Sequence, residues 1–140
     1  MNREDLKNYK YNQIWIKDQT EYIEAQKETI NRLTAILSDM PKGSKYIYDT
    51  EAEKITKLQD CFSELMNMVL QEEEKQKEIV KEVNKMEYPF KNILFKVYIQ
   101  SKTLVKTASE MGYDYKYMCK MHGIALEKFD NTTKKVETRL

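Results

Sequence analysis

Apolar residues recur every three or four positions along most of the chain. Between residues 3 and 40 they follow one stripe with a seven-residue repeat, which consists of Tyr9, Ile16, Ile23, Ile30 and Leu37 and is flanked by Trp15, Tyr22, Leu33 and Ile36. This spacing places apolar side chains on one face of a helix. It predicts a long amphipathic helix that stops before the breakers Pro41, Gly43 and Ser44.

A second apolar stripe follows a loop that we expect to extend from Pro41 to Asp49. Thr50 and Glu53 match a capping box, which predicts that the next helix begins at Thr50. Its seam alternates spacings of three and four through Ile55, Leu58, Phe62, Leu65, Val69, Ile79, Val83 and Met86, with Glu72 and Gln76 at the intervening positions. Two such helices joined by a short loop predict an antiparallel, coiled-coil-like hairpin over residues 1–87.

Three shorter helices are predicted after the hairpin, over residues 88–130. Pro89 suits the first turn of a helix that we expect to end at about Ile99 or Gln100. Phe90, Ile93, Leu94, Val97 and Tyr98 give this helix a broad apolar face. The fold class that we expect is therefore all-α, with the hairpin followed by a three-helix C-terminal part.

The last two helices are separated by a short turn that contains a glycine. Thr103 can cap the first of them, and Gly112 can end it in the left-handed conformation. Asp114 can cap the last helix, which we expect to end at about Phe129, followed by a flexible polar tail over residues 131–140. This arrangement predicts a helix-turn-helix.

The composition agrees with one helical domain in a reducing compartment. Only 3 Gly and 2 Pro are present in 140 residues, too few for a sandwich or barrel. Cys61 and Cys119 stand far apart, whereas a secreted chain of this size usually has more cysteines at patterned spacings. Charges interrupt the first twenty residues and every apolar run. We therefore expect a cytoplasmic protein with neither signal peptide nor membrane span.

Charge is distributed unevenly along the chain. Residues 1–88 contain 14 Lys and Arg against 18 Asp and Glu, whereas residues 89–140 contain 10 against 5. The C-terminal part thus has a net charge of +5 although the whole chain has +1. Because exposed charges are screened within about 10 Å at ordinary salt, this local excess matters more for a polyanionic partner than the total.

A helical projection divides the predicted last helix into two faces. The core side contains Met118, Met121, Ala125 and Phe129, and the opposite side contains Tyr115, Lys116, Cys119, Lys120 and Gly123. Lysine can neutralise phosphates or reach guanine acceptors, and tyrosine can contact phosphate or a thymine methyl. We expect Tyr115, Lys116, Cys119 and Lys120 to enter the major groove of double-stranded DNA. Lys102 and Lys106 would then contact the DNA backbone, and Lys91, Lys96 and Lys128 would add diffuse attraction.

The stretch from Tyr98 to Phe129 resembles the sigma-70 region 4 type helix-turn-helix of small Gram-positive phage and prophage proteins. The matching positions are Met111-Gly112-Tyr113-Asp114, Met121-His122 and Ala125-Leu126. The preceding long helices and their Pro-Lys-Gly loop are also similar to an uncharacterised streptococcal prophage branch. The sequence departs from the family pattern at three positions, where Ser101 replaces a glycine, Thr107 an isoleucine and Asp114 a serine cap.

The resemblance implies a transcription regulator of the ArpU and RinA kind that acts on phage late or structural genes. No equivalent of region 2 is recognisable in the sequence, so we do not expect a complete sigma factor, although the protein could contact RNA polymerase. A helix-turn-helix of this size usually acts in pairs, and we therefore expect a homo-oligomer, with a dimer favoured. Two alternatives remain open: a small-terminase-like DNA packaging subunit, and an adaptor whose helix-turn-helix binds protein.

Catalytic and metal sites have little support in the sequence. His122 is the only histidine and lies one turn from Cys119, but no orienting acid or oxyanion donor is indicated nearby. We expect His122 to pack and hydrogen-bond at the edge of the last helix. One histidine and two remote cysteines do not make a metal site. We therefore expect no enzyme activity, cofactor or metal.

Overall fold

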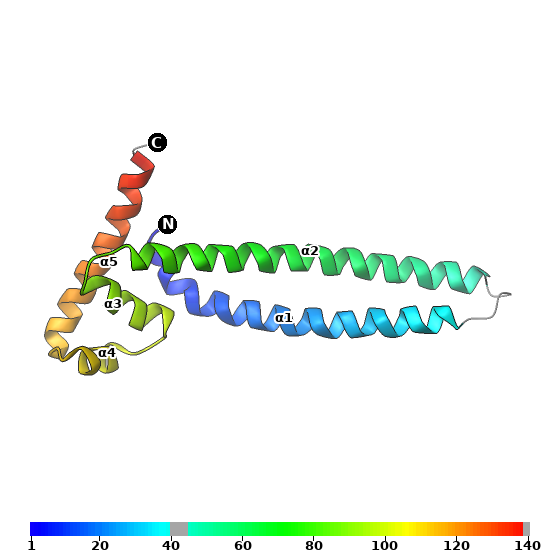
Figure 1. Ribbon diagram of the computed structural model, residues 1–140, viewed down its shortest axis with the longest axis horizontal. Helices are drawn as coiled ribbons and strands as arrows, with labels where there is room; N and C mark the ends of the chain where they lie inside the picture. The colour runs from blue at the N-terminus through cyan, green and yellow to red at the C-terminus, as the bar shows by residue number, and fades with distance from the viewer. Residues whose placement is uncertain (40–44, 139–140) are drawn as a thin grey trace. The chain divides into compact units, whose positions relative to one another are not determined.

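The computed structural model describes residues 1–39 and 45–138, and side chains in residues 1–39 and 49–132. Its α-helices are α1 (Arg3–Ser38), α2 (Lys45–Asn84), α3 (Phe90–Leu94), α4 (Leu104–Met111) and α5 (Tyr115–Thr138), and a π-helical turn η1 (Phe95–Ile99) continues α3 (Figure 1). Every regular element in the described residues is helical, so the predicted all-α class is confirmed. No helix in these ranges combines the length and apolar character needed to span a lipid bilayer.

The chain forms two compact units. Unit 1 contains residues 1–13 and 74–140, and unit 2 contains residues 14–73. Both long helices continue from one unit into the other, because α1 contributes its first turns and α2 its last turns to unit 1. The compact units therefore divide the chain differently from the predicted boundary at residue 87.

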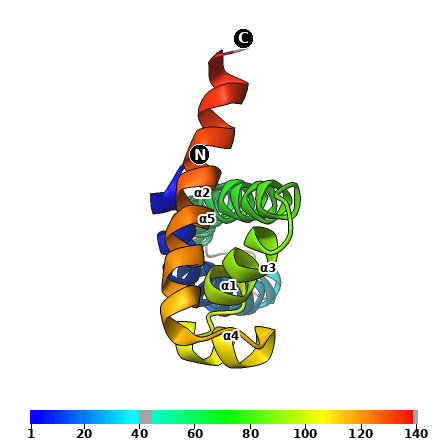
Figure 2. The same ribbon diagram turned by 90° about the vertical axis from the view of Figure 1, so that its left-hand side faces the viewer.

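Unit 1 has a core to which both ends of its sequence contribute. The buried side chains come from α1, α2, α3 and α5, and they are Leu6, Tyr9, Ile79, Val83, Leu94, Ala125, Leu126 and Phe129. Figure 2 shows α5 running past α3, with α4 at the N-terminal end of α5. The first turns of α1 and the last turns of α2 thus cover the apolar face of the C-terminal helices, because a helix pair by itself buries only one face of each helix.

Two polar contacts fix the first turns of α1 within unit 1. The side-chain amide of Gln76 is buried and donates to the backbone oxygen of Tyr9 over 3.0 Å. The backbone N–H and the Nε of Arg3 each donate to a carboxylate oxygen of Asp130, both over 2.7 Å. A buried amide is tolerated only when it is hydrogen-bonded, and the bond to Tyr9 explains why Gln76 occupies a seam position.

Unit 2 consists of the remaining parts of α1 and α2, which run side by side in opposite directions (Figure 1). Its buried apolar residues are Ile30, Ile55 and Val69, and most other seam residues are half-buried. Tyr22 and Ile36, which the stripe placed beside the seam, are more than half exposed. The predicted seam is present, but much of the apolar surface of unit 2 remains open.

Two helix ends differ from the prediction. The helix predicted to begin at Thr50 begins at Lys45, because neither Gly nor Pro interrupts residues 45–50 and extending a helix costs less than nucleating one. The last helix continues past Phe129 to Thr138, again without a Gly or Pro to stop it, so the predicted tail over residues 131–140 begins as helix. The predicted breakers around Pro41 lie outside the described residues.

Candidate functional site

The segment from Thr103 to the first turn of α5 folds as its turn residues predict. The Thr103 Oγ1 accepts a hydrogen bond from the backbone N–H of Lys106 over 3.1 Å, which caps α4. Gly112 has φ of 70°, and the N–H of Tyr113 donates to the carbonyl of Ala108 over 2.8 Å. This is a Schellman motif, which requires a left-handed residue and therefore favours glycine. The predicted end of α4 and beginning of α5 are confirmed.

A small core holds α4 against α5. Ile93, Ala108 and Met118 are buried there, and Met121 packs beside them. Further along α5, Ala125 and Phe129 are buried in the main core of unit 1. The predicted core face of α5 is therefore confirmed, and the orientation of its opposite face is fixed by these contacts.

The opposite face of α5 is exposed over its first three turns. Tyr115, Lys116, Cys119 and Lys120 are all exposed there, as is Gly123, where an added Cβ would lie in open space. A side-chain hydrogen bond with Cys119 raises the pKa of Tyr115. The structure thus brings together the four α5 residues predicted from the sequence, and we call Tyr115, Lys116, Cys119 and Lys120 the α5 face.

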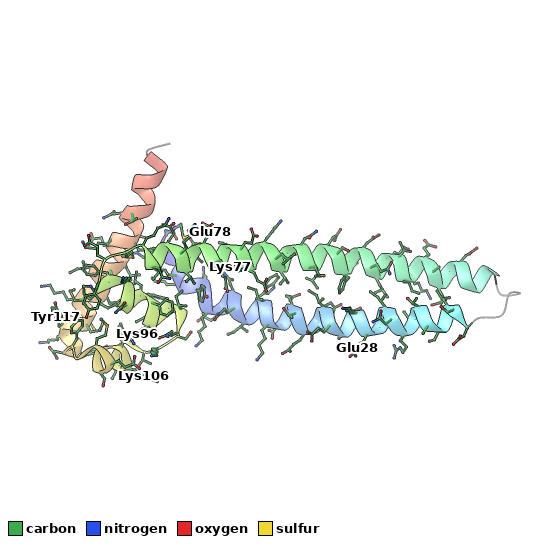
Figure 3. All side chains as sticks on the ribbon, viewed as in Figure 1. Glu28, Lys77, Glu78, Lys96, Lys106 and Tyr117 are labelled. Carbon is green, nitrogen blue, oxygen red and sulfur yellow. The ribbon has the colours of Figure 1, made fainter. Side chains whose placement is uncertain are left out.

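Two tyrosines next to this face were missed by the sequence prediction. The rings of Tyr113 and Tyr117 meet edge to face, with their centroids 5.1 Å apart. Tyr117 is exposed, and it lies at the surface of the same part of the molecule as Lys106 (Figure 3). The helical projection overlooked Tyr117 because it falls between the two faces, although the repeated Tyr-x-Tyr pattern from residue 113 to 117 is visible in the sequence.

Lys102 and Lys106, which were both predicted to contact the DNA backbone, have different surroundings in the structure. Lys106 is exposed on α4. Lys102 is more than half-buried and its Nζ lies 2.9 Å and 3.0 Å from the carboxylate oxygens of Glu110. Lys96 also contacts Glu110, with its Nζ at 2.9 Å. Hydrogen bonds from Lys96 and then Lys102 lower the pKa of Glu110 to about 2. Glu110 therefore offsets part of the positive charge of this segment, which helical spacing could not predict because the three residues lie on different elements.

His122 is held by a tyrosine of the π-helical turn, as expected for a histidine that packs at the edge of α5. The hydroxyl of Tyr98 and the Nε2 of His122 share a hydrogen bond of 2.8 Å, and the two rings stack with centroids 5.7 Å apart. Burial, and next the positive charges of Lys7 and Arg3, lower the pKa of His122. The folded protein therefore favours the neutral imidazole.

This lowered pKa predicts a pH dependence of stability. The unfolded chain binds a proton at His122 more readily than the folded chain, so the free energy of unfolding should fall as pH drops below about 6.5 and through the lower folded pKa. A His122→Gln variant should lose this component, and its stability should depend less on pH. Urea unfolding of both proteins between about pH 7.5 and about pH 5 measures the difference. If the unfolding free energies of the wild type and the variant depend on pH to the same extent, His122 is not the group responsible.

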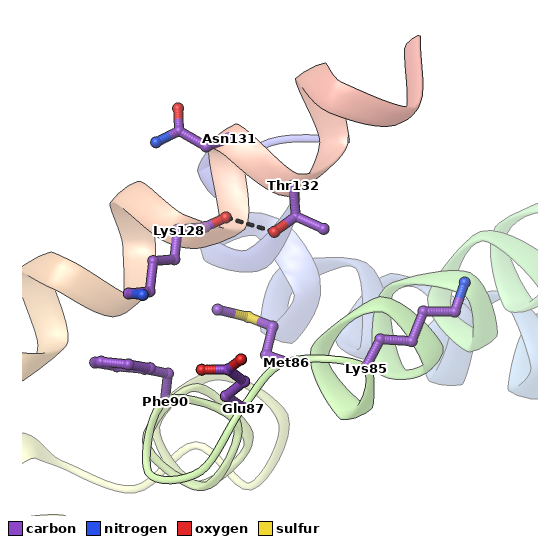
Figure 4. A pocket seen from close by; sticks show the side chains of 7 residues that line it. All are labelled: Lys85, Met86, Glu87, Phe90, Lys128, Asn131 and Thr132. Atoms are coloured by element: carbon purple, nitrogen blue, oxygen red, sulfur yellow. Dashed lines mark hydrogen bonds between the residues drawn. The ribbon is translucent and has the colours of Figure 1, made fainter. Parts of the chain in front are cut away.

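A separate hollow of about 470 Å³ lies between the end of α2, α3 and α5 (Figure 4). Lys85, Glu87 and Lys128 line it, and the Lys128 Nζ lies 4.9 Å from the ring centroid of Phe90. Both signs of charge are present, which suits neither a strongly anionic nor a strongly cationic ligand. Across the described residues, no three His, Cys, Asp or Glu side chains gather in a way that could hold a metal ion.

No protein-family model, no curated protein and no solved structure matches the chain.

Proposed function

We propose that residues 88–130 form a helix-turn-helix and that the protein is a DNA-binding regulator of transcription, acting on phage or prophage genes as the sequence resemblance implies. The observation that supports this most directly is the division of α5. Its core side is fixed by Met118 and Ala125, both fully buried, while the α5 face is exposed from the first turn. Recognition helices of this kind insert their N-terminal residues into the major groove.

The chemistry of the exposed residues suits a DNA duplex. Lys116 and Lys120 are one helical turn apart, so their ammonium groups can reach neighbouring phosphates or guanine edges. Tyr115 and Tyr117 offer hydroxyls for phosphate oxygens and rings for thymine methyl groups. Lys106 on α4 adds a cation at the same end of unit 1 (Figure 3). This combination of basic and aromatic side chains is better suited to a nucleic acid than to an apolar protein surface.

Binding of the purified protein to DNA fragments tiled around its own gene, with competitor DNA present, tests the proposal. We expect one or a few fragments to bind, with an affinity that falls steeply as salt rises. An absence of binding to every fragment would contradict the proposal and favour the protein-binding adaptor. If the purified protein forms a ring of many subunits, a small-terminase-like DNA packaging subunit would be favoured instead.

We further propose that the protein acts as a homodimer through unit 2. A groove of about 310 Å³ lies between α1 and α2 there, lined mainly by the apolar side chains of Tyr22, Ile23, Leu58, Phe62, Leu65 and Met68. Tyr22 and Met68 are each 54% exposed. A second copy would cover these side chains and complete a four-helix bundle, and it would supply the second helix-turn-helix that paired half-sites require.

A Met68→Glu substitution should weaken this dimer, because burying an unpaired carboxylate is costly. We expect the dimer dissociation constant to rise at least about tenfold, which corresponds to about 1.4 kcal/mol. Met66→Glu is the matched control, since Met66 is exposed on the same helix but does not line the groove. Sedimentation equilibrium measures both variants. A monomeric wild-type protein, or equal effects of the two variants, would contradict the dimer and leave the groove to a partner such as RNA polymerase.

A further inference from the structure

A small basic hollow lies where the beginning of α1 meets the segment between η1 and α4. Its volume is about 190 Å³. Three lysines line it together with four hydroxyl-bearing side chains, and these are Lys7, Lys10, Lys102, Tyr11, Tyr98, Ser101 and Thr103. None of the described residues that line the hollow is acidic. The hollow belongs entirely to unit 1 and was not predicted, because its residues lie almost a hundred positions apart in the sequence.

Local structure explains why these side chains converge. Lys7 and Lys10 are three residues apart on α1 and thus share one side of the helix, while the neighbouring Leu6 is buried in the core. On the other wall, Ser101 has φ of 56°, and the N–H of Lys102 donates to the carbonyl of Lys96 over 2.9 Å. This turn ends η1 and leads directly into Thr103, the N-cap of α4.

The electrostatics of the hollow favour an anion. The charge of Lys102 is offset by Glu110, so the excess positive charge comes from the two lysines of α1. Lys10 forms no ion pair with any other described residue, and Lys7 has only a long contact of 3.8 Å between its Nζ and Glu4. The positive end of the α4 helix dipole also lies at Thr103. The effect of Lys7 on the pKa of His122 indicates that this positive potential extends to the Tyr98–His122 pair at the edge of the hollow.

We propose that the hollow binds a phosphate group of the DNA backbone, and that Lys7 and Lys10 thereby extend the DNA contact beyond the helix-turn-helix to the first helix of the chain. This inference rests on the proposed DNA-binding function. Ammonium and hydroxyl groups are the donors that bind phosphate oxygens in protein–DNA complexes, and they fix the position of the protein without reading sequence. The N-terminus of α4 lies beside the hollow and leads to α5, so backbone contact and groove contact can occur on the same duplex.

The test compares a Lys7→Gln/Lys10→Gln variant with the wild-type protein on the fragment that the wild type binds best. At about 0.1 M salt we expect the variant to bind about tenfold more weakly, to specific and competitor DNA alike. The slope of log affinity against log salt should fall by about 1, because the variant no longer neutralises the phosphate in the hollow. A Lys17→Gln/Lys27→Gln variant is the matched control, since it removes the same charge from exposed positions of α1 in unit 2.

The outcomes separate this inference from the proposed function. If the wild type binds DNA and the Lys7/Lys10 variant keeps its affinity and salt slope, or if the control variant loses as much, the inference is wrong while DNA binding stands. If the wild type binds no DNA, both proposals fail. Titration with inorganic pyrophosphate, followed by the amide NMR signals of Ser101 and Lys102, distinguishes the source of the phosphate. If the protein binds no DNA but binds pyrophosphate saturably, and this binding requires Lys7 and Lys10, the ligand of the hollow is a free phosphate compound instead.

Discussion

A Lys116→Ala/Lys120→Ala protein is expected to bind its specific DNA fragment about 100-fold more weakly than the wild type. A lysine that reaches a base edge or phosphate contributes on the order of 1–3 kcal/mol to binding, and two such losses of about 1.4 kcal/mol combine to this factor. Both side chains are exposed, so stability should change by less than about 0.5 kcal/mol. Fluorescence anisotropy at several salt concentrations measures the affinity and its salt slope.

The salt slope then assigns the role of the two lysines. Phosphate contacts would lower the slope by about 2 and weaken specific and competitor binding equally. Base contacts would instead reduce the ratio of specific to competitor affinity. Unchanged specific affinity in the double variant would show that the α5 face does not read the DNA, whatever else the protein binds.

Replacing Phe129 by alanine should produce the largest loss of stability, about 3–5 kcal/mol. Phe129 is only 1% exposed and lies in the core that joins α1, α2, α3 and α5. Removing its ring leaves a cavity that none of these helices can fill alone. This loss is a large fraction of the 5–15 kcal/mol by which typical domains are stable, so the variant should unfold at a much lower urea concentration.

The control for this variant is Val105→Ala. Val105 is 65% exposed on α4, and its truncation should change the unfolding free energy by less than about 0.5 kcal/mol. A cost below about 1 kcal/mol for Phe129→Ala, measured by circular dichroism in urea, would mean that α5 does not pack in unit 1 as described.

Features determined by neighbouring residues could be predicted from the sequence. The cap at Thr103, the left-handed stop at Gly112 and the two faces of α5 depend on spacings within a few residues, and all three are found. The predicted start of α2 at Thr50 was wrong, because a capping box marks where a helix can begin and does not show whether an earlier turn is already helical.

Features that depend on distant residues could not be predicted. Lys96 and Lys102 form ion pairs with Glu110, and Lys7 and Lys102 line the same basic hollow. These residues lie on different elements, and no sequence pattern indicates that the elements are in contact. For the same reason, the sequence did not show which segments of the chain form unit 1. The hairpin pattern indicated that α1 and α2 would pair, but not that Leu6 would share a core with Phe129.

The division of unit 1 between distant parts of the sequence affects the order in which the protein can fold during synthesis. Residues 14–73 leave the ribosome as a continuous stretch and contain every residue of unit 2. Leu6 and Tyr9 are made before them, yet several of their core partners, among them Phe129, are made after them. Because translation proceeds at about 5–20 residues per second, the side chains of Leu6 and Tyr9 remain without these core contacts for several seconds. Nascent chains should therefore complete unit 2 first, and a chaperone that shields exposed apolar helices would act on the first turns of α1.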